Sequence, residues 1–576
     1  MSANDQRLKI VLCWHMHQPY YLDPVHQRYV LPWTYLHAIK DYVDMVWHLE
    51  QCEGAKAVVN FTPTLLDQID DYASNISSYL RFIPNKWISV GPRLKDPLLA
   101  TLVKKRIKSV DDRKNIVHAC LRANQDRLIN RFEHYRQLAD FGRILLAHPE
   151  YLQHVNDNYF SDLVVWYHIA WLGESVKRTN RFVQGLMAKR TGFSYQERVG
   201  LLQLIGELVG SIVKRYKKLH QQGRVELSVT PYGHPIMPLL LDLKSAREAW
   251  PDVELPSMVA YPGGYERSLW HIRQGIKTFE KRFGFRPEGC WPGEGSVNDQ
   301  TLELLHEAGF KWTATGENVL KNSVNLDANK HLGPEYSTHG IYQFRDGINC
   351  FFRDDGLSDE IGFTYSDWHA DDAVANLIHH LQNIRAAQQN NHNALVSIIL
   401  DGENAWEYYP ENGYYFLSAL YKRLSEHPDL RLATFSECLR EKQNIKTYTL
   451  NRITAGSWVY GTFSTWIGHR DKNRAWELLI EAKKTYDKVL ASRKINLSKL
   501  RRLEKQLAIC EASDWFWWFG DDNPGVSVKD FDMLYRMQLE YLYKLLSQVA
   551  PDSLAEPVSR GGGDALHGGV MKPGKV

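Results

Sequence analysis

Short apolar segments that alternate with helical patterns constrain the fold of this chain more than any other feature. They extend over about the first 435 residues and are rich in β-branched and aromatic side chains, which strands favour. Strands that alternate with helices indicate a parallel sheet, because each helix provides the crossover that parallel strands need. Seven or so strands predict an α/β barrel that is incomplete and carries long insertions. The expected strands are Lys9–Trp14, Ala57–Phe61, Val225–Thr230, Gly289–Trp291, Phe310–Ala314, Cys350–Arg353, Ala394–Leu400 and Leu432–Thr434.

The stretches outside these strands form two mainly helical blocks and a tail. Around 98–220, apolar residues recur at intervals of three and four among charged ones, which indicates a helical insertion. Over 446–550 the helical patterns continue and tryptophan is dense. The final stretch, 551–576, is glycine-rich with few bulky apolar residues, which predicts a disordered tail. We therefore expect a catalytic barrel over 1–445 that contains the insertion, a helical domain over 446–550, and this tail.

Polar side chains lie at the ends of several expected strands or just past them. In parallel α/β barrels, functional groups gather at the carboxyl ends of the strands. Repetition of the pattern favours one functional site over a set of unrelated polar loops. The residues are His15, His17, His234, Glu294, Arg353, Asp354 and Asp401, with Glu226 inside its strand.

Two carboxyl groups in this set have the most informative surroundings. Glu294 lies between glycines in CWPGEGSVND, and glycine permits tight turns and close approach of a ligand. Asp401 ends the apolar run of SIILDGENAWEYYPENG, where a buried carboxylate needs partners. Two carboxyl groups that face one cleft are what glycoside hydrolysis requires. Glu403, two residues past Asp401, is a rival for its role, and a solvated turn is the alternative for both segments.

The segment His15-Met16-His17-Gln18 leaves two chemistries open. Residues two apart on an extended chain face the same side, so the histidines could bind a metal or hydrogen-bond sugar hydroxyls. Gln18 adds an amide suited to hydroxyl recognition. The 18 Trp and 30 Tyr residues fit either a large core or a cleft in which sugar rings stack on aromatic faces.

Charge and cysteine content exclude several partners and guide the expected location. With 70 basic and 67 acidic residues, the net charge of +3 provides no electrostatic basis for binding nucleic acid or a membrane surface. We find no secretory signal and no apolar run of membrane-spanning length. Seven scattered cysteines without CxxC spacing indicate reduced thiols, and hence a cytoplasmic protein. The sequence carries no signal for oligomeric state.

Five short motifs, in order, resemble those of glycoside hydrolase family 57, a group of α-glucan-active enzymes. They are His17-Gln18-Pro19, GRVELSVTPYGHPIMPLL (223–240), CWPGEGSVND with Glu294, LDGENAWE with Asp401, and GSWVYGTFSTWIGHRDKNRAW (456–476). Each motif is weak singly, but together they are specific, and the resemblance extends from Leu8 to about Phe519. It implies a (β/α)7 TIM-like barrel whose C-terminal helical domain closes over the cleft. It also implies a retaining reaction with Glu294 as nucleophile and Asp401 as acid/base, without metal or other cofactor.

The resemblance also assigns substrate-binding residues. His15, His17, Gln18 and His234 are expected at the sugar, with Trp458 and Trp466 as walls of the cleft and Trp406 as a further candidate. Arg353 and Asp354 are included on their strand-end position alone. The segment Ser513–Asp522 could reach the cleft or could be a core helix.

The predicted function is hydrolysis of an α-glucan polysaccharide or maltooligosaccharide, as in α-amylases and amylopullulanases, with α-1,4 bonds as the expected target and α-1,6 bonds as a further candidate. The alternatives are a 4-α-glucanotransferase or branching enzyme that uses the same site, and a non-catalytic glycan-binding protein. A metal-dependent hydrolase would also place HxH after its first strand, but it needs further ligands that the sequence does not clearly provide.

Overall fold

The structure is a computed structural model that describes residues 7–82, 92–258, 260–387, 394–441, 447–492 and 494–563, without the side chains of Pro334 and Glu335. Part of the expected tail, 564–576, lies outside these residues.

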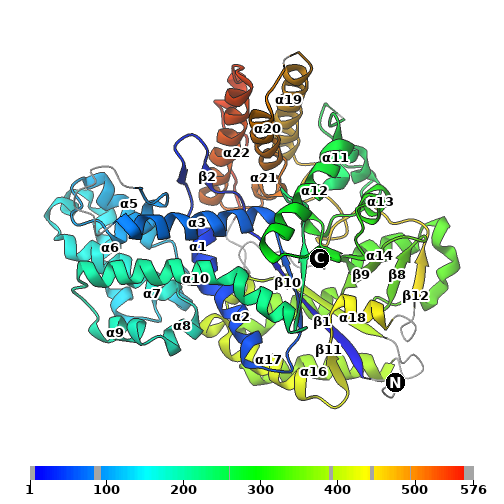
Figure 1. The fold of residues 1–576 in the computed structure, drawn as a ribbon, viewed down its shortest axis with the longest axis horizontal. Helices are drawn as coiled ribbons and strands as arrows, with labels where there is room; N and C mark the ends of the chain where they lie inside the picture. The colour runs from blue at the N-terminus through cyan, green and yellow to red at the C-terminus, as the bar shows by residue number, and fades with distance from the viewer. Residues whose placement is uncertain are drawn as a thin grey trace.

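Seven parallel strands close into a barrel, which confirms the predicted fold class (Figure 1). Their order around the barrel is β10-β1-β4-β5-β6-β7-β9, and pairing of Ser397 with Arg353 joins β10 to β9. All nine residues of β1 are buried, as expected for a strand with helices outside and packed side chains inside. The strands are β1 (Leu8–Met16), β4 (Ala57–Phe61), β5 (Val225–Val229), β6 (Gly289–Cys290), β7 (Trp312–Gly316), β9 (Asn349–Arg353) and β10 (Leu395–Asp401).

The remaining strands of the described residues lie outside the closed ring: some extend its sheet, and two form a separate hairpin. The last expected strand, Leu432–Thr434, is found as β11 (Leu430–Leu432). It pairs with the first residues of β1, Leu8–Ile10, whereas β4 pairs with β1 only from Cys13 onward. The others are β8 (Ile341–Phe344) beside β9, β12 (Thr447–Leu450) beside β8, and the hairpin β2 (Leu22–Asp23) with β3 (Arg28–Tyr29).

Helices surround the barrel and connect its strands. The first connection contains α1 (Trp33–His37), η1 (Ala38–Tyr42) and α2 (Val43–Gln51). Those after β5 are α11 (Met237–Leu241), η4 (Leu243–Arg247), α12 (Gly264–Phe283), η5 (Gly293–Gly295), α13 (Asp299–Glu307), α14 (Glu317–Val324), η6 (Asp327–Glu335), α15 (Asp355–Asp359), η7 (Glu360–Thr364), η8 (Tyr365–Asp367), α16 (Ala370–Ala387), η9 (Ala405–Glu407), η10 (Pro410–Gly413), α17 (Tyr414–Glu426) and α18 (Phe435–Arg440).

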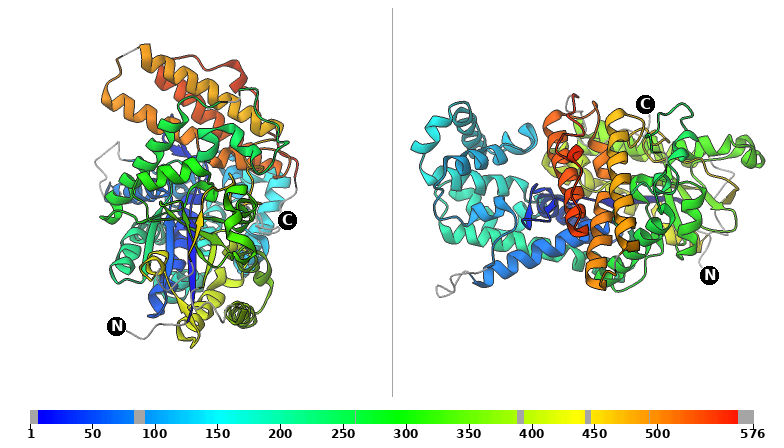
Figure 2. Two further views of the ribbon diagram at one scale, coloured as in Figure 1. Left: turned by 90° about the vertical axis from the view of Figure 1, so that its right-hand side faces the viewer. Right: turned by 90° about the horizontal axis from the view of Figure 1, so that it is seen from above.

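A helical insertion lies between β4 and β5 and extends to one side of the barrel (Figures 1 and 2). Its longest helix, α10, begins with a capping box in which Ser194 and Glu197 satisfy each other's backbone N–H groups. The helices are α3 (Pro63–Phe82), α4 (Pro97–Leu102), α5 (Val110–Cys120), η2 (Gln125–Ile129), α6 (Glu133–Ala147), η3 (Pro149–His154), α7 (Asp157–Trp171), α8 (Glu174–Thr179), α9 (Arg181–Lys189) and α10 (Tyr195–Gln221).

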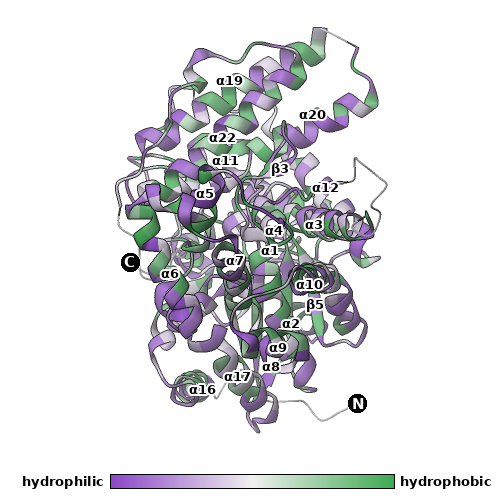
Figure 3. Cartoon of the chain, turned by 90° about the vertical axis from the view of Figure 1, so that its left-hand side faces the viewer, coloured by the Kyte–Doolittle hydropathy of each residue, from purple (hydrophilic) through white to green (hydrophobic). Residues whose placement is uncertain are grey.

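The C-terminal helices stand on the barrel (Figures 1 and 2). Figure 3 shows hydrophobic and hydrophilic residues mixed along α19 and α20, which fits helices with one buried face. Residues 551–563 also make contacts, since Asp532 accepts hydrogen bonds from the backbone of Val558 and Ser559. Ordered packing therefore extends beyond residue 551, where the sequence suggests a disordered tail. The elements are α19 (Arg470–Ser492), α20 (Leu497–Cys510), α21 (Ser513–Trp518), α22 (Gly525–Leu546) and η12 (Asp552–Leu554).

Among the described residues, no helix combines the length and apolar composition that crossing a membrane would require.

Candidate active site

A pocket of about 660 Å³ opens where the barrel strands end, and it contains both carboxyl groups singled out in the sequence. Parallel pairing explains part of this convergence. His15 on β1 is in register with Asp401 on β10 and with Asn60 on β4, so three polar side chains meet at one level. The volume lies within the range typical of small-molecule binding sites.

Glu294 sits on a tight turn directly after β6. Its φ of 56° lies in the left-handed region, which a non-glycine residue adopts only when its surroundings hold it there. A side chain at the preceding Gly293 would meet the carbonyl oxygen of Pro235 at 2.5 Å, so glycine is required for this close approach. The carboxyl group accepts hydrogen bonds from Trp458 Nε1 (3.2 Å, to Oε2) and Ser513 Oγ (3.3 Å, to Oε1).

Asp401 ends β10 with its carboxyl group in the same pocket, where Oδ2 accepts a hydrogen bond from Asn404 Nδ2 at 2.9 Å. Burial raises the pKa of Asp401. Burial, and then the negative charge of Asp401, raise the pKa of Glu294 to about 8. The two groups therefore titrate as a pair that retains one proton at neutral pH.

Three histidines stack beside Glu294. The ring centroids of His17 and His234 are 4.0 Å apart, and those of His15 and His234 are 5.1 Å apart. Burial lowers the pKa of His15 to about 3 and that of His234 well below its usual value, so both rings are neutral. His15 Nδ1 lies 2.7 Å from Asn60 Oδ1, and His234 Nδ1 lies 2.8 Å from Ser513 Oγ.

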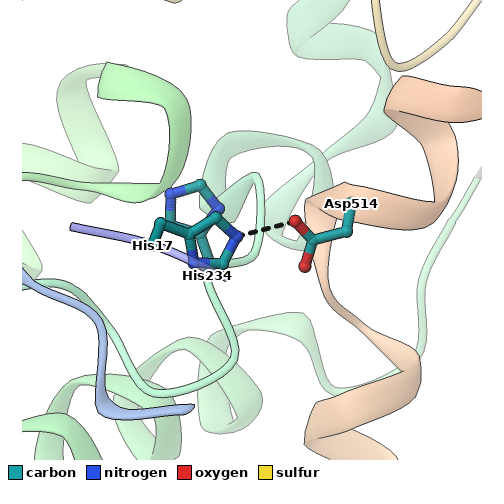
Figure 4. A group of neighbouring side chains, drawn as sticks. All are labelled: His17, His234 and Asp514. Atoms are coloured by element: carbon teal, nitrogen blue, oxygen red, sulfur yellow. Dashed lines mark hydrogen bonds and ion pairs between the residues drawn. The ribbon is translucent and has the colours of Figure 1, made fainter. Parts of the chain in front are cut away.

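His17 differs from the other two because it faces Asp514 on α21, with Nε2 and Oδ1 2.6 Å apart (Figure 4). Although burial lowers the pKa of His17, the charge and hydrogen bond of Asp514 outweigh it, and the pKa is raised overall. The ligand atoms of His17, His234 and Asp514 lie within 4.8 Å of one another, close enough to meet at a metal ion. However, both ring nitrogens of each histidine already contact protein partners, namely Thr62 and Asp514 for His17, and Ser513 and His15 for His234.

Glu403, the rival to Asp401, is buried against the first motif. Its Oε1 accepts hydrogen bonds from the backbone N–H of His17 (3.3 Å) and from Gln18 Nε2 (3.2 Å). Burial, with the charges of Asp401 and Asp41, raises its pKa well above the usual value, so the carboxyl group is neutral. Glu403 thus anchors the segment that carries His17 and Gln18.

The remaining sequence candidates divide between the pocket and the core. His15, His17, Gln18, His234, Arg353 and Trp458 line the pocket. Arg353 is neutralised there by Asp355 and Asp359, each at 2.7 Å. The candidates that do not line it are Asp354, Trp406 and Trp466.

These three candidates have structural surroundings. Asp354 caps α15 by accepting from Leu357 N and faces His339 at 2.9 Å. Trp406 is 1% exposed and packs on Trp14, while Trp466 is fully buried. The structure places these three side chains outside the residues that line the pocket, since strand-end position and tryptophan content do not specify which way a side chain points. Glu226 is likewise internal, since it accepts from Trp312 Nε1 and Ser436 inside the barrel.

Sequence reasoning missed several pocket residues that lie on the two helical blocks. Arg122, Asn124 and Trp171 come from the insertion, and Asp530 and Phe531 come from α22. Both readings of the segment Ser513–Asp522 hold: Asp514, Trp517 and Trp518 line the pocket, whereas Trp515 and Phe516 are buried in the core. The high density of tryptophan in Ser513–Asp522 is the sequence feature that could have indicated these contributions to the pocket.

Comparisons with known proteins agree with this architecture. The sequence model of glycosyl hydrolase family 57 matches residues 11–451. A search of curated protein sequences gave no match.

Three solved structures are similar in fold. The branching enzyme of Pyrococcus horikoshii matches with a TM-score of 0.56 at 15% identity, covering 94% of this chain and 90% of that one. The branching enzyme of Thermococcus kodakaraensis gives 0.55 at 14% identity with the same coverage. The α-amylase AmyC of Thermotoga maritima gives 0.54 at 13% identity, covering 94% and 93%.

Proposed function

The chain belongs to glycosyl hydrolase family 57, and from this premise we propose that it is a retaining enzyme that hydrolyses α-glucans, of the α-amylase or amylopullulanase type. The observation that carries the proposal is that Glu294 and Asp401 open into one pocket, where burial raises the pKa of both groups and the charge of Asp401 raises that of Glu294 further. A retaining glycosidase needs such a pair, with one carboxyl group ionised and one protonated.

In the proposed reaction, Asp401 donates its proton to the glycosidic oxygen while a Glu294 carboxylate oxygen attacks the anomeric carbon. The leaving chain departs with the proton, and a glycosyl ester to Glu294 remains. Asp401, now ionised, takes a proton from water, which attacks the ester and releases the sugar and the Glu294 carboxylate. In the free enzyme the shared proton resides on Glu294. In the form that reacts, this proton has moved to Asp401, which leaves Glu294 ionised.

The pocket walls fit a chain of sugar rings. Trp458, Trp517 and Trp518 line the pocket, together with Trp171 from the insertion. Apolar sugar faces stack on such rings, while the polar groups between them bind hydroxyls. We retain the proposed division into a barrel over 1–445 and a helical domain over 446–550, with residues of both contributing to the cleft.

Two variants and two substrates test the proposal. With amylose, both Glu294→Gln and Asp401→Asn should lose activity by at least about 100-fold. With α-maltosyl fluoride, whose leaving group needs no acid, Asp401→Asn should still release one burst of fluoride per active site. Glu294→Gln should release none, and retained turnover by this variant would remove the proposed nucleophile. Binding of amylose by the wild-type protein without any turnover would instead favour the alternative of a glycan-binding protein.

Transfer to a sugar hydroxyl instead of water is the alternative within the same site, as in branching enzymes and 4-α-glucanotransferases. It differs only in what attacks the glycosyl ester. Product analysis with amylose, pullulan and maltooligosaccharides distinguishes them: shorter chains with new reducing ends support hydrolysis, and rearranged chains with a constant number of reducing ends support transfer. Loss of activity with a chelator and its return with zinc would support the metal-dependent alternative.

A cytoplasmic location remains part of the proposal. Its support is that all seven cysteines are free, six of them buried.

A further inference from the structure

We propose that Ser513, which the C-terminal helix α21 brings to the barrel, is a positioning residue for the nucleophile and forms the first link of a hydrogen-bond chain from Glu294 to Asn60. The inference rests on the proposed role of Glu294. It assigns to one hydroxyl group the task of orienting that carboxylate and stabilising its ionised form.

The chain is continuous and buried. Ser513 Oγ lies 3.3 Å from Glu294 Oε1 and 2.8 Å from His234 Nδ1. His234 Nε2 lies 3.1 Å from His15 Nε2, and His15 Nδ1 lies 2.7 Å from Asn60 Oδ1. Ser513 is fully buried, and its backbone N–H also donates to the carbonyl oxygen of His234 at 3.1 Å. Two separate contacts therefore hold Ser513 against the His234 turn.

The far end of the chain fixes the tautomer of His15. Asn60 Oδ1 is an acceptor, because Asn60 Nδ2 donates to Ser228 and Thr230 donates to Oδ1. His15 must therefore carry its proton on Nδ1, and since the ring is neutral, its Nε2 is an acceptor. A proton between the two Nε2 atoms must then belong to His234.

The number of protons in the hydrogen-bond chain depends on the protonation state of Glu294. Four contacts join the five residues, and each needs one proton. Neutral Ser513, His234 and His15 supply three, so protonated Glu294 supplies the fourth. The chain is thus complete when Glu294 is protonated, as it is in the free enzyme.

Ionisation of Glu294 reverses the direction of the chain. Once the Glu294 proton has passed to Asp401, the Ser513 hydroxyl donates to Oε1, and Ser513 Oγ accepts from His234 in the tautomer of that ring that carries its proton on Nδ1. The freed Nε2 of His234 accepts from the backbone N–H of Glu294, which lies 3.4 Å away. In this state no proton lies between the Nε2 atoms of His234 and His15, but Ser513 keeps both of its contacts and is the donor to Oε1 of the reactive carboxylate.

The charged groups around Glu294 do not duplicate this contact. Asp401 and Asp514 repel its negative charge, and His17 attracts it across space. Trp458 donates to the other oxygen, Oε2. Among the described residues, the Ser513 hydroxyl makes the one side-chain hydrogen bond to Oε1, at 3.3 Å, so its removal leaves that oxygen without a hydrogen-bond donor to orient it.

The test measures kcat/KM for fluoride release from α-maltosyl fluoride against pH in wild type, Ser513→Ala, Ser513→Cys and Ser513→Thr. Alanine and cysteine remove the strong donor, and kcat/KM should fall about 10- to 100-fold. Because a hydrogen bond to the carboxylate favours ionisation, its loss should also move the acidic limb of the profile to higher pH. Ser513→Thr keeps a hydroxyl group and should restore both quantities to within a few-fold of wild type.

Ser268→Ala serves as the matched control, since this serine on α12 is also fully buried and its hydroxyl has no hydrogen-bond partner among the described residues. It should leave the profile unchanged. Wild-type kcat/KM and an unshifted limb in both Ser513→Ala and Ser513→Cys would overturn the inference. If Glu294→Gln is inactive in the same assay, that result leaves the proposed function intact, whereas an active Glu294→Gln enzyme would overturn the function itself.

Discussion

At the scale of single residues, the pocket keeps carboxyl groups protonated that would be ionised in water. Glu294 and Glu403 are both buried beside Asp401, and the pKa of each is raised. The causes are the same, but the surroundings differ. Glu294 faces the pocket from a strained turn, whereas Glu403 holds the backbone of His17. One group is therefore placed to react and the other to support.

Replacing Glu294 by glutamine should stabilise the protein at alkaline pH. The pKa of the carboxyl group is about 8 in the fold and 4.5 in its ordinary state, so the folded form binds more protons between these values and loses stability as pH rises through them. Glu294→Gln removes this loss, which is on the order of 5 kcal/mol at pH 9. Chemical denaturation should show a difference from wild type at pH 9 that disappears at pH 4. An equal difference at both pH values would contradict the raised pKa.

Replacing Glu403 by glutamine should leave amylose hydrolysis within a few-fold of wild type. The neutral amide has the shape of the neutral acid and can still accept through its oxygen from His17 N–H. Glu403→Ala, which removes the acceptor from a buried donor, should cost activity and about 1–3 kcal/mol of unfolding free energy. A loss in Glu403→Gln as severe as that in Asp401→Asn would instead make Glu403 the acid.

At the scale of elements, the strands were predictable and the helical contributions to the site were not. His15 and Asp401 follow apolar runs, so their position at the strand ends could be read from the sequence, and parallel register then brings them together. Ser513 reaches Glu294 across 219 positions because α21 folds back over the barrel. Nothing in its local sequence specifies that contact. The same holds for Arg122 and Asp530, whose pairing depends on how two helical blocks meet.

The ion pair between Arg122 and Asp530 should limit the width of the pocket. Arg122 Nη1 lies 2.9 Å from Asp530 Oδ2 and joins the insertion to α22, with the guanidinium 5.4 Å from the Trp33 ring. Arg122→Ala should raise the ratio of kcat/KM for amylose to that for maltotriose several-fold, while stability changes by less than about 1 kcal/mol because the pair is partly exposed. The exchange Arg122→Asp with Asp530→Arg should restore the original ratio. If Arg122→Ala leaves the amylose-to-maltotriose ratio of kcat/KM unchanged, the ion pair does not limit the space available to the substrate.

At the scale of the whole molecule, a buried charge network fastens the C-terminal helices to the barrel. Glu511, at the end of α20, contacts Arg267 Nη2 and His271 Nε2 on α12, each at 2.7 Å. Despite burial, the charge of Arg267 lowers the pKa of Glu511 to about 2. His271 in turn accepts from the backbone N–H of Gly233, next to His234. The packing of the C-terminal helices against the barrel is therefore coupled to the conformation of the turn that carries His234.

Glu511→Gln should destabilise the fold by about 3–5 kcal/mol at pH 7, because it leaves Arg267 buried without its counter-charge. The stabilisation is present above the ordinary glutamate pKa and is lost as pH falls through about 2, so the difference from wild type should shrink in acid. Glu266 lies on α12 beside Arg267 but is exposed, so Glu266→Gln should change stability by less than about 0.5 kcal/mol. Equal effects of the two variants would contradict the proposed role of the network.

The covalent glycosyl-enzyme is the central claim, and mass spectrometry of a trapped intermediate tests it most directly. Asp401→Asn should accumulate the intermediate after treatment with α-maltosyl fluoride, because the first step needs no acid and the second lacks its base. Peptide mapping should then locate a maltosyl group on Glu294. A maltosyl group on any other residue, or fluoride released without any covalent adduct, would contradict the account.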